Sequence, residues 1–319
     1  MQRAGASRRR RAQRGGGVSA IAASPRPNPV RAFMRLVMIE HSIFALPFAY
    51  LAALTAMVTA PGGPGIQWGT LGLITVAMVS GRTVAMAANR IIDRKIDAQN
   101  PRTANRELIT GVVSGRTAWA GLILALIVFL VSAAALNWLS LALAPLAVVV
   151  LVLYSYAKRF TNYPQAFLAL AQAVAPLGAW IGVTGRWSWP AFVLGLAVGT
   201  WIGGFDCIYA CQDYEADQRI GIGSVPVRWG IAGSLRISSV THVVTVLLLV
   251  WFGALTGYGW LWWLGLLLIA VVFVYEHSIV KADDLSRVNR AFFTANGVIG
   301  IVLFAFALAD LVIRQGLRP

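Results

Sequence analysis

Charged residues are scarce in this chain of 319 residues. Asp, Glu, Lys and Arg together make up 12% of the sequence, about half the share that soluble domains usually carry. Hydrophobic residues account for 58%, and the mean hydropathy is +0.70. A sequence with so little charge excludes an ordinary soluble fold and predicts that most of the chain lies in a bilayer.

Cysteine and histidine are also rare, with two and three copies respectively. Cys207 and Cys211 lie four residues apart in one apolar segment, which provides too few ligands for a structural zinc site. We expect both to pack as small residues, and we expect the same of His242. The sequence therefore gives little support to a zinc or haem protein.

After residue 35 the chain has no segment long enough for a separate soluble domain. Apolar stretches of about 20 residues, the length that a helix needs to cross the hydrocarbon core, follow one another instead. They predict an all-α polytopic membrane protein with one transmembrane domain over 33–319. The nine expected membrane helices cover 36–59, 68–92, 117–136, 138–157, 164–184, 188–214, 233–256, 259–280 and 293–313.

The first 35 residues hold nine of the 27 basic residues and no acid. The run from Arg8 to Arg11 is followed by glycines and prolines, a composition typical of disordered segments. We predict a disordered basic tail over 1–32. It either contacts anionic lipid in a bacterial membrane, which we favour, or acts as an organellar transit peptide. We expect no nucleic-acid partner, since membrane topology explains the excess positive charge better.

The remaining basic residues gather in the loops that follow the even-numbered predicted helices, such as the loop after 68–92. By the positive-inside rule these loops and the N-terminus are cytoplasmic. The protein is therefore expected in the cytoplasmic membrane of a bacterium, and the mitochondrial inner membrane is the alternative.

Half of the 12 acids lie in two short segments. The spacing in each segment stacks oxygen-bearing side chains on one helix face, at the cytoplasmic end of a span. The first set is Asn89, Asp93 and Asp97. The second set is Asp206, Asp213 and Asp217. Stacked carboxylates repel one another unless cations compensate them. Magnesium ions, which bind carboxylates together with phosphate oxygens, would do so while holding a diphosphate. The alternative is two solvated helix ends whose acids pair with nearby arginine and lysine.

Four blocks of the chain resemble the UbiA superfamily of intramembrane prenyltransferases, and the resemblance runs from about residue 33 to 312. The block 89–103, NRIIDRKIDAQNPRT, looks like the first aspartate-rich motif, and 209–217, YACQDYEAD, like the second. The block 154–165 resembles the loop after the fourth helix in 4-hydroxybenzoate polyprenyltransferases, and 221–224 resembles the turn after the second motif. The first motif begins Asn-Arg, where several relatives have Asn-Asp, so one carboxylate is missing here.

Two further segments, 39–48 and 275–289, look more like the UbiA-like branch of menaquinone-forming bacteria. That branch implies 1,4-dihydroxy-6-naphthoate as the acceptor in place of 4-hydroxybenzoate. The pairs Glu40–His41 and Glu276–His277 lie in these segments. Each pair either lines the acceptor pocket or forms hydrogen bonds between helices, and the sequence does not decide between the two.

The resemblance implies a helical bundle with a central cavity open to lipid, capped by the two aspartate motifs. It implies Mg²⁺-dependent transfer of a polyprenyl group from polyprenyl diphosphate to a small aromatic acid, in ubiquinone or menaquinone biosynthesis. The expected metal ligands are Asp93, Asp97, Asp213 and Asp217; the expected catalytic residues are Asp93, Asp213 and Asp206; the expected substrate contacts are Arg82, Asn89, Arg102, Tyr154, Lys158, Arg159 and Tyr209.

Asp206 either handles the acceptor hydroxyl and its proton or pairs with Arg82 as a structural partner. Two other classes of protein also place acids in membranes. A transporter or channel would need a polar path through the midplane, whereas both aspartate sets lie at one face. Another Mg²⁺-dependent transferase, a CDP-alcohol phosphotransferase, would carry a long DG-containing motif that this sequence lacks.

Overall fold

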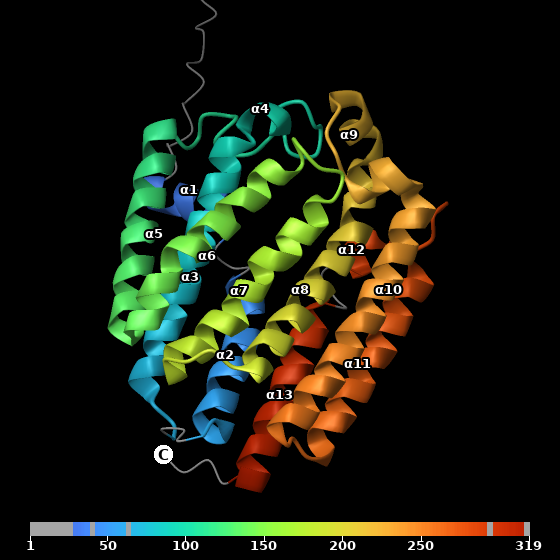
Figure 1. Cartoon of the computed structure of the whole chain (residues 1–319). Helices are drawn as coiled ribbons and strands as arrows, with labels where there is room; N and C mark the ends of the chain where they lie inside the picture. Colours follow the sequence, from blue (N-terminus) through green and yellow to red (C-terminus); the bar gives the residue numbers. More distant parts are fainter. Residues whose placement is uncertain (1–27, 39–41, 62–64, 292–295, 316–319) are drawn as a thin grey trace, which may run out of the picture.

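The computed structural model describes residues 28–38, 42–61, 65–291 and 296–315, and within these ranges the regular elements are helices (Figure 1). In chain order they are α1 (Pro29–Leu36), α2 (Ser42–Thr59), α3 (Trp68–Ile92), α4 (Arg94–Asp97), α5 (Gly115–Leu136), α6 (Trp138–Ala157), α7 (Pro164–Thr184), α8 (Trp189–Tyr209), η2 (Ala210–Asp213), α9 (Tyr214–Ile220), α10 (Val225–Thr256), α11 (Trp260–Ile279), α12 (Val288–Arg290) and α13 (Asn296–Gln315).

The prediction of an all-α polytopic membrane protein is confirmed. Over the described ranges, seven segments are long and apolar enough to cross a membrane, and α2 and α13 contain shorter apolar helices at Leu46–Thr59 and Gly297–Ile313. Each of the nine predicted spans corresponds to one of these helices. The short elements α4 and α9 lie at the same end of the bundle, next to the ends of α3 and α8 (Figure 1).

The outer surface of the bundle is suited to lipid. Large apolar side chains such as Leu124, Leu247 and Leu267 are exposed on the helix flanks. Exposed tryptophans stand at the start of α3, α6, α8 and α11, the end of the bundle opposite α4 and α9. Because tryptophan prefers the boundary between hydrocarbon and headgroups, this ring of indoles indicates where one membrane interface lies.

Close contact between α7 and α8 depends on glycines spaced four residues apart on α8. The three glycines and the α7 residues that they face are Gly195, Gly199 and Gly203, against Ala173, Ala169 and Gln165. A Cβ atom at position 199 would lie 2.6 Å from the Ala169 carbonyl oxygen. Only glycine allows the two backbones to approach this closely, as small residues do in other membrane helix pairs.

Three predicted spans differ from the structure by more than one helical turn at one end. The span 188–214 is divided, because α8 ends at Tyr209 and the chain continues as η2 and α9. Helix α10 begins at Val225 and not at 233, because Pro226 suits the first turn of a helix. Gly230 then bends it with φ 71° and ψ 170°, a conformation open to glycine. Of the predicted span 36–59, α2 covers Ser42–Thr59, and Leu36 is the last residue of α1.

Helix α1 begins within the last residues of the segment predicted as a tail; residues 1–27 lie outside the described ranges. The Asn28 side chain accepts a hydrogen bond from the Val30 N–H at 2.9 Å and so caps the helix. At its other end, the buried Arg90 of α3 donates from Nε to the Leu36 carbonyl oxygen at 3.2 Å. The helix is therefore attached to α3 at its C-terminal end.

Candidate active site

The first aspartate motif lies where α3 passes into α4. Asp93 ends α3 and has φ −87° and ψ 0°. Backbone hydrogen bonds nevertheless continue through it, from the Asp93 N–H to the Asn89 oxygen at 2.9 Å and from the Asp97 N–H to the Asp93 oxygen at 2.8 Å. The Asn89 amide also donates to Asp93 Oδ2 at 2.8 Å. The backbone therefore keeps the predicted helical spacing of the three residues, and the side chains of Asn89 and Asp93 are in contact.

Two basic residues at the end of α6 hold the Asp93 carboxylate, which is 2% exposed. Lys158 Nζ lies 2.8 Å from Oδ2, and Arg159 Nη1 lies 2.9 Å from Oδ1. Arg159 also donates to the carbonyl oxygens of Ser155 and Ile92. These contacts bring the predicted substrate-binding residues Lys158 and Arg159 directly to the first motif, although they are 65 positions or more away in the sequence.

Asp97 is also buried, and it accepts a hydrogen bond from Arg106 in the loop that follows α4. The same loop folds back under the motif, since Thr103 Oγ1 donates to the Asp97 carbonyl oxygen at 2.8 Å. Arg106 was not among the predicted site residues. In the sequence it is one of several basic residues after the second predicted span, and the positive-inside rule alone explains such a run.

The loop after the first motif reaches across to the second motif. Arg102 Nε donates to Asp213 Oδ1 at 2.9 Å, and Arg102 Nη2 lies 2.5 Å from Asp213 Oδ2. Asn100 donates to the same Oδ1 at 3.0 Å. The Arg102 guanidinium also lies 5.2 Å from the centre of the Tyr209 ring. The two aspartate motifs thus lie together at one end of the bundle, as the matched depth of the two stripes predicted.

The surroundings of Arg102 favour the charged form of its side chain. Burial opposes the charge, but the hydrogen bond to Asp213 and the attraction of that carboxylate outweigh the burial, so the pKa of Arg102 is raised above its ordinary value. The Arg102 guanidinium binds the carboxylate through two N–H groups, and the same pair of donors also suits a phosphate group.

Asp206 lies deeper than Asp213, on the last turn of α8. Tyr154 lies on α6, directly before Ser155, whose hydroxyl accepts a hydrogen bond from the Asn89 amide at 3.3 Å. Arg82 is half-buried on α3, two turns before Asn89; its predicted role stays a prediction.

The residues present fit magnesium in their chemistry. The carboxylates are hard oxygen donors, and Asp217 on α9 is buried as are Asp93 and Asp97. Over the described part of the chain, no three His, Cys, Asp or Glu side chains converge on one metal position. Magnesium in phosphate sites needs only one or two carboxylates and takes its other ligands from phosphate oxygens and water. The site therefore suits an ion that enters together with a diphosphate.

The pair Glu276–His277 takes part in a separate network on the other face of α8. His242 Nδ1 lies 2.9 Å from His277 Nε2 and 3.7 Å from a Glu276 oxygen. His242 Nε2 lies 3.2 Å from the Trp201 carbonyl oxygen. Of the two alternatives for this pair, the structure contains the hydrogen bonds between helices. Glu40 and His41 lie outside the described residues.

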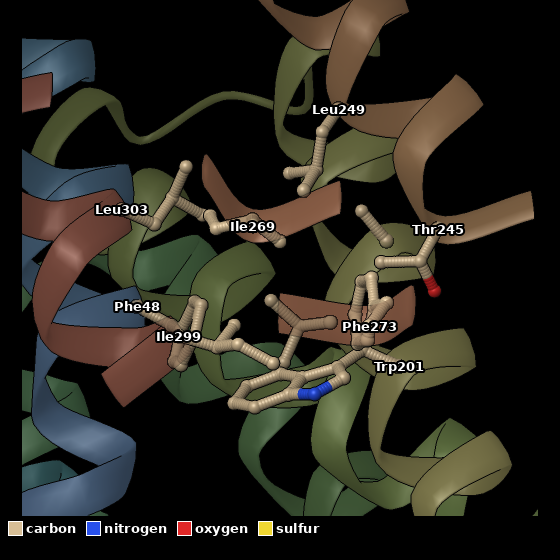
Figure 2. Close-up of a pocket in the computed structure, with 10 residues that line it drawn as sticks. Phe48, Trp201, Thr245, Leu249, Ile269, Phe273, Ile299 and Leu303 are labelled. Atoms are coloured by element: carbon tan, nitrogen blue, oxygen red, sulfur yellow. The ribbon is translucent and has the colours of Figure 1, made fainter. Parts of the chain in front are cut away.

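An apolar cavity of about 10 Å³ lies beside this network (Figure 2). It is lined by side chains of α2, α8, α10, α11 and α13, among them Phe48, Trp201, Phe273 and Leu303, and Thr245 adds one hydroxyl. A space of that size holds about one water molecule, whereas small-molecule sites usually measure some hundreds of cubic ångströms. The cavity is therefore a packing gap and not a substrate pocket.

Comparison with known proteins gives one consistent result. The sequence profile of the UbiA prenyltransferase family matches residues 46–298. The 4-hydroxybenzoate octaprenyltransferase of Pseudomonas aeruginosa is 32% identical over 287 residues, which is 88% of this chain and 94% of that protein. The enzyme of the same name from Chromohalobacter salexigens is 30% identical over 277 residues, covering 86% and 90%.

Solved structures agree with the sequence comparison. The apo structure of a UbiA homolog from Aeropyrum pernix K1 is 32% identical and superimposes with a TM-score of 0.77 over 86% of this chain and 98% of that one. The structure of a UbiA homolog from Archaeoglobus fulgidus bound to DMAPP and Mg²⁺ is 20% identical, with a TM-score of 0.67 over 88% and 99%, and shares the fold. The chain therefore belongs to the UbiA prenyltransferase family and is a membrane-embedded prenyltransferase.

Proposed function

We propose that this protein transfers a polyprenyl group from polyprenyl diphosphate to a small aromatic acid, with Mg²⁺ as cofactor, in the biosynthesis of ubiquinone or menaquinone. The observation that supports the proposal best is the link between the two aspartate motifs through Asn100, Arg102 and Asp213. Through this link the carboxylates and the basic side chains lie together at one end of the bundle. A diphosphate with a long apolar tail needs that combination, because its head is highly charged and its chain belongs in lipid.

The leaving group would be held by the basic residues that now pair with the aspartates. The C–O bond between the allylic carbon and the diphosphate breaks, and both bonding electrons leave with the diphosphate. Lys158 and Arg159 directly after α6, and Arg102 and Arg106 in the loop after α4, would neutralise that charge. These side chains pair with the carboxylates in the structure and would turn to phosphate oxygens when the diphosphate binds.

Asp93, Asp97, Asp213 and Asp217 would hold magnesium, with Asn89 in support. The bound ion supplies electrostatic stabilisation for the charge that develops on the diphosphate. Asn89 is well placed for its supporting role, because its amide already touches both Asp93 and the Ser155 hydroxyl.

The allylic cation is then attacked by a ring carbon of the acceptor next to its hydroxyl group. A new C–C bond forms, and the ring carbon then gives its proton to the released diphosphate or to water, which restores aromaticity. Asp206 would accept the proton of the neighbouring hydroxyl or hold that hydroxyl in place. The ring faces of Tyr154 and Tyr209 would shield the cation from water. Arg82 would bind the acceptor carboxylate from the deeper side of the site.

The proposal includes two candidate acceptors. The curated relatives named above are 4-hydroxybenzoate octaprenyltransferases, whereas segments 39–48 and 275–289 resemble the branch that implies 1,4-dihydroxy-6-naphthoate. The test incubates membranes containing the protein with a labelled polyprenyl diphosphate and each acceptor, with Mg²⁺ and with chelator. We expect a prenylated product from one acceptor, in the presence of Mg²⁺ only. No product from either acceptor, in membranes where the protein is folded, would contradict the proposal.

A further inference from the structure

Asn100 links the two aspartate motifs, and its own position is fixed by a tight turn. It is 8% exposed, and the Thr103 N–H donates to its carbonyl oxygen at 3.0 Å, which closes the turn 100–103. Pro101 stands at the second position of this turn, where proline is favoured because its φ angle already suits the turn. The Thr103 hydroxyl also donates to the Asp97 carbonyl oxygen at 2.8 Å, so the turn is attached to the first motif.

The side-chain amide of Asn100 has one orientation in this turn. Its Oδ1 accepts a hydrogen bond from the backbone N–H of Arg102 at 2.9 Å. A backbone N–H only donates, so the amide oxygen lies on this side and the NH₂ group on the other. That NH₂ group donates to Asp213 Oδ1 at 3.0 Å. The turn therefore presents a fixed, uncharged donor to the second motif.

The Asp213 carboxylate is held from outside its own helices. Asp213 ends η2 and directly precedes α9, yet its carboxylate bonds with the loop after α4. Arg102 Nε contacts the same Oδ1 as Asn100, at 2.9 Å. The two partners differ in exposure, since the Arg102 side chain is 39% exposed whereas Asn100 is buried. A long, partly exposed arginine side chain can turn to another anion, but the short amide in the turn cannot follow it.

We propose that Asn100 is a positioning residue, which holds the Asp213 carboxylate beside the first motif once Arg102 has turned to the diphosphate. This inference rests on the function proposed above, in which Arg102 exchanges a carboxylate for phosphate oxygens. Asp213 then keeps a hydrogen bond from a neutral donor, which brings no positive charge close to a metal position. Hydrogen bonds of this kind orient carboxylates that bind metals. The carboxylate thus stays in place while its negative charge is available to Mg²⁺.

The first test measures the distance between the two motifs in the full-length protein and needs neither substrate nor metal. Spin labels are attached to cysteines introduced at Gln99 and Gln218, which are both exposed, whereas the native cysteines are buried. Pulsed electron paramagnetic resonance then gives the distribution of distances between the labels. We expect a narrow distribution in the otherwise unchanged protein and also in Arg102→Gln, because Asn100 still holds Asp213 there.

Adding Asn100→Ser to Arg102→Gln should broaden the distribution, because neither partner of Asp213 is left. Serine suits this test, since its hydroxyl can accept the backbone N–H of the turn but is too short to reach Asp213. Asn100→Ser alone should keep the narrow distribution, because Arg102 still binds the carboxylate. A narrow distribution in the double variant would overturn the inference, and so would a broad one in Asn100→Ser alone, which would mean that Asn100 only folds the turn.

The second test is a double-mutant cycle in the prenyl transfer assay. We expect Asn100→Ser to lower kcat about 10- to 100-fold, since it removes a hydrogen bond to a charged group, and to raise the Mg²⁺ concentration that gives the half-maximal rate. The KM for the aromatic acceptor should change less than about twofold. In the Asp213→Asn background the same substitution should change kcat less than about threefold, because Asn100 acts through Asp213. An equal factor in both backgrounds would contradict the inference.

Asn137→Ser is the matched control, because Asn137 uses its amide in the same way at the opposite end of the bundle. Its Oδ1 accepts a hydrogen bond from the Ser140 N–H at 2.9 Å, and its NH₂ group donates to the Ile181 carbonyl oxygen at 2.8 Å. We expect Asn137→Ser to lower the melting temperature at least as much as Asn100→Ser and to keep the wild-type kcat. An equal fall in kcat in both variants would leave Asn100 a structural role only. The distance measurement decides the inference even if the protein prenylates neither acceptor.

Discussion

Arg102 and Asp213 form a two-point ion pair across 111 positions of sequence, with Nε 2.9 Å from Oδ1 and Nη2 2.5 Å from Oδ2. The pair joins the loop after the first aspartate motif to the last residue of η2. Arg102 is 39% exposed at its side chain, so the contact lies at the entrance to the candidate site and not inside the bundle. A substrate diphosphate could therefore take the place of the Asp213 carboxylate without rearranging the helices.

The first prediction concerns this pair. Arg102→Gln removes the planar cation that we expect to bind the diphosphate, and it should lower kcat/KM for polyprenyl diphosphate about 10- to 100-fold in steady-state assays. Arg116→Gln is the control, because Arg116 is exposed at the start of α5 and carries the same charge. An equal loss in both variants would indicate a general effect of surface charge.

The second prediction concerns orientation. Cysteine introduced at Gln99, in the loop after α4, should be protected from an impermeant thiol reagent added outside intact cells, whereas cysteine at Arg186, between α7 and α8, should react. Both positions are exposed, and the native Cys207 and Cys211 are buried. The reverse pattern of labelling would show that the end with α4 and α9 faces outward and that the charge rule misleads here.

The third prediction concerns the arginine-rich segment. Deleting residues 2–27 keeps Asn28, which caps α1, and removes seven arginines. We expect kcat in detergent to stay within about twofold, while binding to vesicles with anionic lipid weakens, since each basic residue near such a surface contributes about 1 kcal/mol. A fall in kcat beyond about tenfold would identify the segment as part of the catalytic or folding machinery.

The fourth prediction concerns the α7–α8 contact. A methyl group at Gly199 would meet the Ala169 carbonyl oxygen, so Gly199→Ala should destabilise the protein by about 1–3 kcal/mol and lower its melting temperature in detergent. Gly178→Ala is the control, because a Cβ at that position of α7 has no neighbour within 4 Å. Equal melting temperatures for the two variants would mean that the helices can separate at little cost.

Much of the architecture follows from sequence, because a bilayer imposes one length and one polarity on every span. The predicted limits 68–92, 138–157 and 164–184 coincide with α3, α6 and α7. The errors occur where helices leave the hydrocarbon. Beyond Tyr209, water and polar partners replace lipid, and local geometry decides whether the chain continues as one helix or breaks into η2 and α9.

The sequence predicts only part of the candidate site, because local spacing does not show how the loops fold. Spacing on one helix face identifies Asp93, since it needs only the pitch of a helix. The second set, Asp206, Asp213 and Asp217, was predicted on one continuous helix, but the structure divides it between α8, η2 and α9. Spacing also does not identify partners such as Arg106, whose contact with Asp97 depends on how the loop after α4 folds back. One signal was available for Asn100: it carries a polar amide group three positions after Asp97, inside the first motif. Its contact with Asp213 joins the two motifs.

The most direct test of the account compares purified Asp93→Asn and Asp213→Asn with the double variant, over a range of Mg²⁺ concentrations. If both motifs act on one diphosphate, each single substitution loses about 3–4 kcal/mol of transition-state stabilisation and lowers the rate about 10²–10³-fold in a folded protein. The double variant should lose less than the product of the two factors, because the residues act as one unit. Single variants that keep near-normal activity and the wild-type Mg²⁺ dependence, with lowered thermal stability only, would show that these aspartates are salt-bridged helix ends and not the catalytic centre.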